Sequence, residues 1–467
     1  MSFRSIHFIR SIRSILPTLL LGCSLTATSL AAQTADAPLN TTEPPEIAFH
    51  GFGTLGAVHV DGGGTAIARD LTQPKGANNR GLNWDIDSRL GVQANWQATE
   101  NLEAVAQIVA RYRNANDFRP ELTWGFIKYS PNEYIDLRAG RVGFDAFLSA
   151  DSRDVGYSFL WVRPPIEYYG TLLFPYHDGG DLTLRLPTAE GLTRMKLYTG
   201  VTRQHVSSMM NQHEWAGGIH TASIGAVQNL DGSRIDGGLI EYQDTRWTLR
   251  YGLARYTVNK EFPSGQLDTR GLLRLAADQA LAQGNVTASN TLSAFTRDAQ
   301  IAGTHSSLKS LAVAYEDGPL QAQAAISRFT GESLLIPNNK SGYASLGYRI
   351  NQLTPYASWA FIKSRQSHRA SELTGHAPDA LVQVAQFMLG SPMTNQQTWS
   401  LGVRYDLTSN LLLKLQVDRI HNRNCSPVAL PVVSNTSPCP PPLLLPTVPV
   451  NWNGRANVYT AVIDFIF

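Results

Sequence analysis

Histidine is the most versatile catalytic and metal-binding side chain, and three histidines, His205, His213 and His220, share one stretch of the sequence. Their spacing matches no compact zinc-binding pattern, and a solvated polar loop accounts for them. The run at 342–347 lacks the G-x-S-x-G spacing of a serine nucleophile elbow. No phosphate-binding glycine loop or dinucleotide fingerprint occurs. We therefore expect no enzyme activity, no metal site and no cofactor.

The chemistry that remains is that of charged side chains. Segment 144–179 is rich in aromatic residues, and its run at 144–170 carries six charged residues, Asp145, Asp151, Arg153, Asp154, Arg163 and Glu167. Charged groups that line a pore determine which ions and solutes pass. Basic residues that share one phase of an alternating pattern could form an opposing wall: Arg89, Arg111, Arg138, Arg185, Lys196, Arg250, Arg404 and Lys414. In the alternative, these charges only hydrate a wall or pair with one another.

The elements that would position these residues are strands with a period of two. Trp399, Leu401 and Val403, for example, alternate with Ser400 and Gly402. Such alternation over about ten residues is typical of a barrel strand. We expect about sixteen strands, near residues 46–60, 84–97, 101–112, 121–130, 134–143, 180–187, 193–202, 235–243, 246–259, 308–316, 320–328, 341–350, 353–364, 397–406, 410–420 and 455–467.

The connections between these strands alternate between short turns and long loops. The long loops are expected near 61–83, 144–179, 203–234, 260–307, 365–396 and 421–454. Short periplasmic turns and long outer loops are typical of a bacterial transmembrane barrel. An even number of strands puts both ends of the barrel on the periplasmic side. Within the loops, 272–281 and 378–389 have helical apolar spacing.

Composition excludes several classes of protein. The chain has 467 residues, of which 16% are charged, below the roughly 25% of soluble domains. Its 39 basic and 37 acidic residues give a net charge of +2, so no strong basic field points to nucleic acid. Three cysteines exclude a disulfide-dense scaffold. Cys425 and Cys439 lie in the proline-rich last outer loop, where an oxidising compartment favours a disulfide worth about 3 kcal/mol; two free thiols are the alternative.

The first 31 residues are predicted to be a signal peptide. Arg4, Arg10 and Arg13 precede a short apolar run, and small residues at 29–31 form a cleavage site. The run is too short to span a membrane. A lipoprotein cleavage box ending at Cys23 is the alternative. Residues 32–45 would then form a short periplasmic segment, and 46–467 the barrel.

The pattern of the C-terminal strand distinguishes a membrane barrel from a soluble sheet. One face carries Tyr459, Ala461, Ile463, Phe465 and Phe467, and the other face is more polar. A lipid-facing strand needs such an apolar outer face with aromatic residues at its ends. The terminal Phe resembles the assembly signal of bacterial outer-membrane proteins. Within it, Tyr459, Ile463, Phe465 and Phe467 are the predicted signal residues for the barrel assembly machinery.

In strand number, loop rhythm and terminal Phe, the mature chain resembles the superfamily of trimeric Gram-negative porins. The runs at 153–157 (RDVGY) and 161–165 (WVRPP) are similar to a group of proteobacterial porin-like proteins. The resemblance implies an all-β fold, a closed antiparallel transmembrane β-barrel with an inward-folded third outer loop at 144–179. It also implies a homotrimer in outer-membrane lipid. The loop departs from the common acidic porin loop, so no ion selectivity is implied.

We expect an outer-membrane porin, a water-filled channel for passive diffusion of small hydrophilic solutes or ions. The alternative is a barrel without a channel, acting as an adhesin or structural protein through its large outer loops. A third class, an outer-membrane hydrolase, is suggested by the run at 453–455 (NGR), which resembles an outer-membrane phospholipase signature. That family uses a smaller barrel with a Ser–His pair on its outer face, and no strand here matches that pair.

Overall fold

The computed structural model describes residues 46–61, 66–70, 72–73, 76–113, 115–170, 175–207, 227–261, 269–365, 372–379, 382, 394–422 and 454–467. Its elements are β1 (Glu46–Asp61), β2 (Arg89–Thr99), β3 (Leu102–Arg111), β4 (Glu121–Asn132), β5 (Ile135–Gly143), η1 (Gly156–Ser158), α2 (Ile166–Tyr169), β6 (Tyr176–Pro187), β7 (Gly191–Thr202), β8 (His205–Ser207), β9 (Val227–Asn229), β10 (Ser233–Asp244), β11 (Trp247–Thr257), α3 (Thr269–Ala282), α4 (Val286–Asp298), β12 (His305–Asp317), β13 (Leu320–Gly331), β14 (Asn338–Tyr348), β15 (Leu353–Arg365), β16 (Asn395–Thr408), β17 (Leu411–Asn422) and β18 (Arg455–Ile466).

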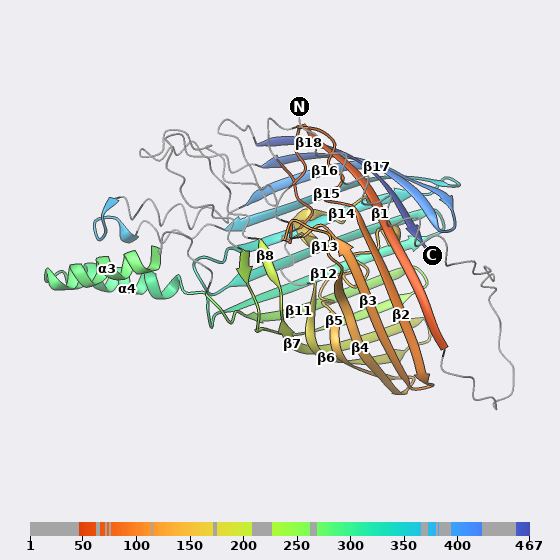
Figure 1. Cartoon of the computed structure of the whole chain (residues 1–467), viewed down its shortest axis with the longest axis horizontal. Helices are drawn as coiled ribbons and strands as arrows, with labels where there is room; N and C mark the ends of the chain where they lie inside the picture. Colours follow the sequence, from red (N-terminus) through yellow and green to blue (C-terminus); the bar gives the residue numbers. More distant parts are fainter. Residues whose placement is uncertain are drawn as a thin grey trace. The chain divides into compact units, whose positions relative to one another are not determined.

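Sixteen of the strands form one closed antiparallel barrel (Figure 1). Each strand pairs with its neighbours in the sequence, except that β7 pairs with β10, and β8 and β9 form a separate two-stranded sheet. The barrel closes where β1 pairs with β18, from Phe52 opposite Ile466 to Asp61 opposite Asn457. The predicted fold class and the number of sixteen strands are confirmed.

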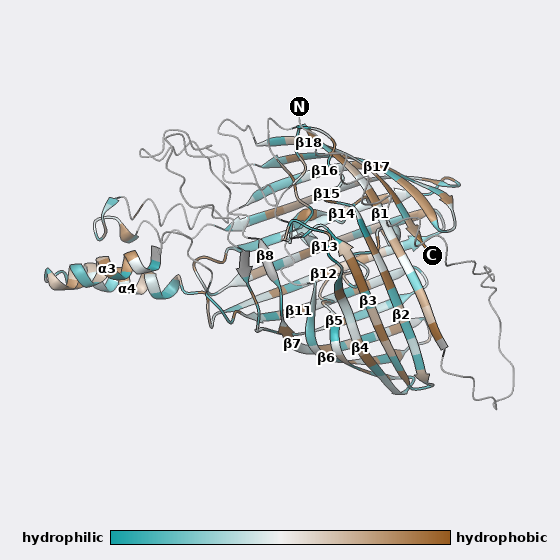
Figure 2. Cartoon of the chain, viewed as in Figure 1, coloured by the Kyte–Doolittle hydropathy of each residue, from teal (hydrophilic) through white to brown (hydrophobic). Residues whose placement is uncertain are grey.

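The strands have an apolar outward face and a mostly polar inward face (Figure 2). On β16, for example, Trp399 and Leu401 are exposed, whereas Thr398 and Ser400 are buried. Because successive side chains of a strand point to opposite faces, the period-two pattern becomes a division between inside and outside. An exposed apolar wall of this extent suits lipid rather than water.

The seam between β1 and β18 depends on glycine. A Cβ atom built on Gly51 would lie 2.1 Å from a ring carbon of Phe467, and one built on Gly53 would lie 2.3 Å from a ring carbon of Phe465. The terminal aromatic rings therefore lie directly over backbone that has no side chain. The exposed Tyr459, Ile463 and Phe467 follow the predicted outward phase of the last strand, while their role as an assembly signal stays a prediction.

Two helices precede β12. The helical spacing predicted for 272–281 is confirmed by α3, whereas α4, which begins after Asn285, was not predicted. The Asn285 side chain accepts a hydrogen bond from the backbone N–H of Ala288 at 3.0 Å. Gly284 adopts a φ of +77° in the turn between the helices. Leu273 of α3 and Leu292 and Phe295 of α4 form a buried cluster. Among the described residues, no helix is long and apolar enough to span a membrane.

Other predictions differ from the structure at element boundaries or fall outside the described residues. The predicted strand at 84–97 begins only at Arg89, and the strand predicted from residue 180 already begins at Tyr176. The signal peptide, the segment at 32–45, the cysteine pair, and His213 and His220 lie outside the described residues, as does most of the helix predicted at 378–389.

Candidate functional site

Segment 144–170, which follows β5, is attached to inward side chains of the barrel wall from its first residues. Asp145 is buried between two basic side chains. Its Oδ2 lies 2.5 Å from Lys196 Nζ on β7, and its Oδ1 lies 2.6 Å from Arg250 Nη1 on β11. Arg250 also donates a hydrogen bond to the Phe147 carbonyl oxygen at 2.6 Å. Burial opposes ionisation of Asp145, but Lys196 and Arg250 outweigh it and lower its pKa to about 2.

This ion pair predicts an acid-sensitive attachment of the segment. Because the pKa of Asp145 is lower in the folded than in the unfolded chain, its contribution is present above about pH 4 and is lost as the pH falls through about 2. We expect the free energy of unfolding to fall by about 2 kcal/mol over this interval from Asp145 alone. Urea unfolding of the detergent-folded barrel at several pH values measures it. In Asp145→Asn this component should be absent, and equal pH dependence of both proteins would contradict the prediction.

Aromatic rings hold the same segment against the wall. The rings of Phe147 and Tyr168 have centroids 4.4 Å apart, and the ring of Tyr343 on β14 lies 5.2 Å from Tyr168 and 5.6 Å from Trp161. The hydroxyl groups of Tyr169 and Tyr343 are hydrogen-bonded at 3.1 Å. These residues belong to one buried cluster inside the sheet. Such packing fixes the position of the segment far more firmly than surface charges could.

Basic wall residues bind the backbone of the segment. Lys414 on β17 is fully buried and donates to the carbonyl oxygens of Gly156 at 2.7 Å and Trp161 at 3.0 Å. Arg404 on β16 donates to the carbonyl oxygens of Tyr157 at 3.1 Å and Phe159 at 3.3 Å. Two of the basic residues predicted to face a pore therefore contact protein.

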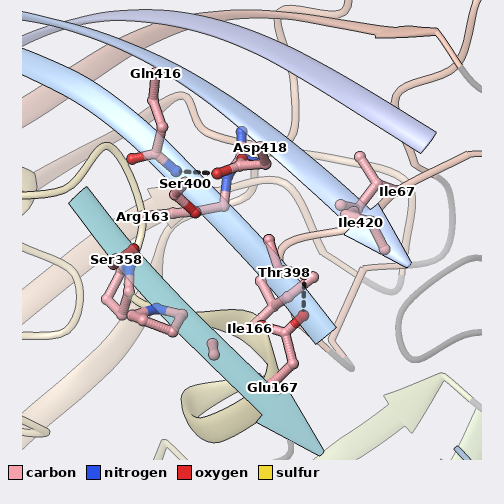
Figure 3. Close-up of a pocket in the computed structure, with 13 residues that line it drawn as sticks. Ile67, Arg163, Ile166, Glu167, Ser358, Thr398, Ser400, Gln416, Asp418 and Ile420 are labelled. Atoms are coloured by element: carbon pink, nitrogen blue, oxygen red, sulfur yellow. Dashed lines mark hydrogen bonds and ion pairs between the residues drawn. The ribbon is translucent and has the colours of Figure 1, made fainter. Parts of the chain in front are cut away.

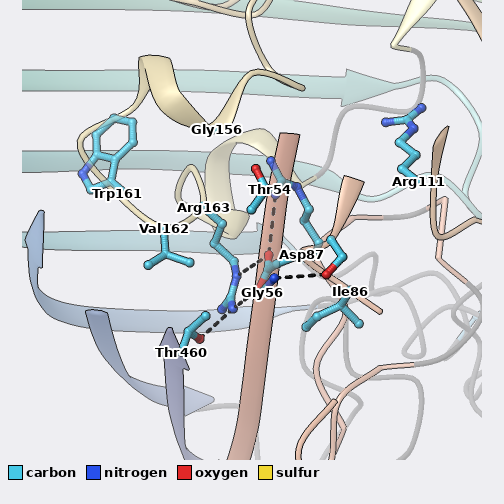
Figure 4. Close-up of polar contacts among 12 residues, drawn as sticks. Thr54, Gly56, Ile86, Asp87, Arg111, Gly156, Trp161, Val162, Arg163 and Thr460 are labelled. Atoms are coloured by element: carbon cyan, nitrogen blue, oxygen red, sulfur yellow. Dashed lines mark hydrogen bonds and ion pairs between the residues drawn. The ribbon is translucent and has the colours of Figure 1, made fainter. Parts of the chain in front are cut away.

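Arg163 is the centre of a buried charge cluster (Figure 4). Its Nη2 lies 2.6 Å from Asp87 Oδ2, and its Nη1 lies 3.2 Å from Asp418 Oδ2. Nη2 also donates to the Thr460 hydroxyl at 2.8 Å. Arg69 adds a second ion pair to Asp87, at 3.5 Å. The cluster therefore joins the segment to the connection between β1 and β2 and to β17 and β18, and Arg163, Asp87, Asp418 and Thr460 are all buried.

Glu167 in α2 has no basic partner among the described contacts. It accepts a hydrogen bond from Gln396 Nε2 at 2.6 Å and another from the Thr398 hydroxyl, both on β16. Burial raises the pKa of Glu167, against the lowering effect of these two hydrogen bonds. Beside it lies a cavity of about 20 Å³, bordered also by Arg163, Ser400 and Asp418 (Figure 3). A space of this size holds about one water molecule.

The middle of the segment is closer to water. Asp151 is exposed, but the surrounding protein atoms and the nearby Asp145 carboxylate raise its pKa. Arg153 is half-buried, and desolvation lowers its pKa. Asp154 is buried and lies 3.2 Å from Arg111 Nη1 on β3. Of the six charged residues predicted to line a constriction, Asp145, Asp154, Arg163 and Glu167 are therefore buried against protein. Asp151 is exposed, and Arg153 is half-buried with its Nη1 shielded from solvent.

The eight basic residues predicted for the wall all lie on the inward phases of their strands. They differ in what they contact. Five have ion pairs or hydrogen bonds to the segment, namely Lys196, Arg250, Arg404, Lys414 and Arg111. Arg89 is buried, and a Cβ atom on Gly156 would lie 2.9 Å from its Nη2. Arg138 and Arg185 pair with Asp181 and Asp136 of neighbouring strands.

Sequence reasoning missed the carboxylates that neutralise these bases. Asp464 lies 3.0 Å from Lys414 Nζ, and Glu241 Oε2 lies 2.5 Å from Arg250 Nε. Asp464 and Asp418 share the inward phase of the wall bases, so the alternation could have identified both. Arg194, which pairs with Glu241, was missed although it precedes Lys196 by two residues. Within the described residues, no group of acidic, histidine or cysteine side chains could hold a metal ion.

Comparison with known proteins finds similarity at the level of the barrel. No family model and no curated protein sequence matches the chain. A loop-deletion mutant of OmpT, an outer membrane protein of Vibrio cholerae, is 9% identical with a TM-score of 0.49, over 91% of this chain and all of that one. An anion-selective porin from Comamonas acidovorans is 11% identical with a TM-score of 0.48, over 91% and 100%. Salmonella typhi OmpF in complex with daunomycin is 10% identical with a TM-score of 0.46, over 91% and 98%.

Likeness this distant carries no functional argument. The chain is a closed antiparallel barrel of sixteen strands with an apolar outward face. That is the architecture of transmembrane β-barrels of the bacterial outer membrane, the predicted location.

Proposed function

We propose that this barrel is an outer-membrane channel through which small hydrophilic solutes or ions diffuse passively. The observation that carries the proposal is a contrast between two parts of the inward wall. From β12 to β18, most inward side chains next to segment 144–170 are buried, such as Ser310, Ser358 and Lys414. From β2 to β7, by contrast, seven inward polar residues are only half-buried: Gln93, Asn95, Glu103, Lys128, Arg138, Arg185 and Arg194.

A packed segment on one side and a hydrated wall on the other are what a narrowed pore requires. Sixteen-stranded barrels enclose more space than their own side chains fill. In the proposed channel, segment 144–170 is the inward-folded loop that restricts the passage, and Asp145, Arg163 and Glu167 hold it in position. Asp151 is its charged group toward the water, and β2 to β7 form the opposite wall.

The charges of that opposite wall support a preference for anions. In three ion pairs the basic side chain is more exposed than its acidic partner: 22% against 1% for Arg138 and Asp181, 34% against 12% for Arg185 and Asp136, and 41% against 2% for Arg194 and Glu241. The guanidinium groups therefore face solvent while the carboxylates lie behind them. Since nearby lumen charges rather than total charge govern selectivity, the passage carries a positive potential.

A planar bilayer recording tests the channel. We expect the mature chain, refolded in detergent and added to a bilayer, to give steady stepwise currents that are linear in voltage. Heat-denatured protein from the same preparation is the control. Heat-modifiable migration in gels shows independently that the barrel has folded.

A folded barrel without current would contradict the proposal and favour the adhesin or structural role. Homotrimeric assembly belongs to the same proposal, and groups of three equal current steps would support it.

A further inference from the structure

Four basic residues form a continuous row across the outward face of β12 to β15. Lys309 lies opposite Arg328, Arg328 lies opposite Lys340, and Lys340 lies opposite Lys363. All four side chains are exposed. Directly opposed residues of an antiparallel pair have Cβ atoms about 4.5–5.5 Å apart. The four residues therefore form one unbroken line of positive charge on the wall, here called the cationic row.

Within the part of the chain that the structure describes, the positive charges of the cationic row are not neutralised by protein carboxylates. Among the described residues, no carboxylate forms an ion pair with any of its four members. Elsewhere on the outward face the chain does neutralise such charges, as where Asp236 lies opposite Arg255 and bonds Arg234 at 2.8 Å. Like charges directly opposite one another destabilise a sheet. Four adjacent positive charges would therefore be stabilised by an anionic ligand.

The position of the row along the strands indicates where that ligand lies. On β12 and β13, the next outward side chain beyond the row, on the side away from the long loops, is apolar. Leu311 is 56% exposed and Ile326 is 51% exposed. From the periplasmic end of β13 at Leu320 to Arg328 is eight residues, about 27 Å along the strand and about 20 Å along the membrane normal at the usual tilt. The row thus lies where the apolar wall meets the outer headgroup layer.

A hollow in the outward face continues from one end of the row. It has a volume of about 590 Å³ and reaches Lys309 and Arg255. Outward side chains of Leu197, Ile240 and Leu253 line it, and Gly238, which lacks a side chain, lies among them. Its lining is suited to an apolar chain. A ligand that combines several negative charges with apolar chains would therefore match both the row and the wall beneath it.

We propose that Lys309, Arg328, Lys340 and Lys363 bind the phosphate groups of an anionic lipid of the outer leaflet, with its acyl chains against the apolar wall and the hollow. Basic side chains at the membrane surface attract anionic headgroups, and Arg and Lys are the usual ligands of phosphate. The site is separate from the pore and does not depend on ion conduction.

Lipid binding by the detergent-folded barrel tests the site. The probe is diphosphorylated lipid A, counted per protein chain by native mass spectrometry. We expect the triple variant Arg328→Gln, Lys340→Gln, Lys363→Gln to bind it at least tenfold more weakly than the wild type. The matched control removes three exposed charges elsewhere, by Arg119→Gln, Arg274→Gln and Arg349→Gln, and should bind normally. The pair Lys340→Arg, Lys363→Arg should also retain binding.

Two further arms identify the source of the phosphate. Lipid A without its phosphates should bind at least tenfold more weakly, and inorganic phosphate at the same concentration should not displace the lipid. The proposal is overturned by a correctly folded triple variant that binds lipid A as well as the control does. Equal binding of dephosphorylated lipid A would show that the row does not recognise the phosphate groups. Displacement by inorganic phosphate alone would show that the ligand need not be a lipid.

Discussion

Arg163→Ala is expected to release segment 144–170 and to raise the single-channel conductance. Arg163 neutralises Asp87 and Asp418 in a site hidden from water. Removing one partner of a buried ion cluster leaves uncompensated charge and costs about 3–5 kcal/mol. We therefore expect a matching loss in the free energy of unfolding, together with larger and noisier currents than those of the wild type.

Two variants separate this effect from a general loss of folding. Arg119→Ala removes an arginine whose side chain is 81% exposed and should change neither quantity. The combination Arg163→Met, Asp418→Asn leaves Asp87 paired with Arg69 and should regain much of the lost stability, because no charge remains buried alone. If Arg163→Ala folds with normal stability and conductance, the cluster does not hold the segment.

The second large effect is expected on ion selectivity. Under a salt gradient the wild-type channel should show a reversal potential of the sign for anion preference. The triple variant Arg138→Gln, Arg185→Gln, Arg194→Gln removes three positive charges and leaves Asp181, Asp136 and Glu241 in place. We expect this exchange to move the reversal potential toward cation preference and to change its sign.

The control for selectivity changes the same number of charges away from the proposed passage. Arg119→Gln, Arg274→Gln and Arg349→Gln, combined in one chain, should leave the reversal potential as in the wild type. Cation preference in the wild-type channel would contradict the argument from exposure. Equal shifts in both triple variants would show that total charge, rather than the arginines of this wall, determines selectivity.

The barrel itself could be predicted because its signal is local. Each strand shows an alternation that needs only neighbouring residues, and each long loop is recognisable from its length. Boundaries were less certain where alternation continued beyond the paired backbone. Asp85 and Asp87 follow the alternating pattern of β2 but precede its first residue, Arg89. Helix α4 was missed because its sequence, VTASNTLSAFTRD, has only a few large apolar residues to mark a helical face.

The candidate site was predicted in its residue types but not in their environments. Asp145, Arg163 and Glu167 were expected to face water, and each is buried. The sequence contains no sign of this, because the partners are distant in the chain. Arg163 and Asp87 are 76 residues apart, and Arg163 and Asp418 are 255 residues apart. Which charge meets which depends on the path of the segment across the wall.

The sequence by itself determined that the chain is a sixteen-stranded barrel with an apolar exterior, because alternation and loop length are properties of short stretches. Only the tertiary structure decided which charges bind segment 144–170 and which stay partly open to solvent on β4 to β7. It also decided that Lys309, Arg328, Lys340 and Lys363 stand in one row, since that depends on strand register. Burial and register arise when the sheet closes, and closure brings together residues that no local pattern relates.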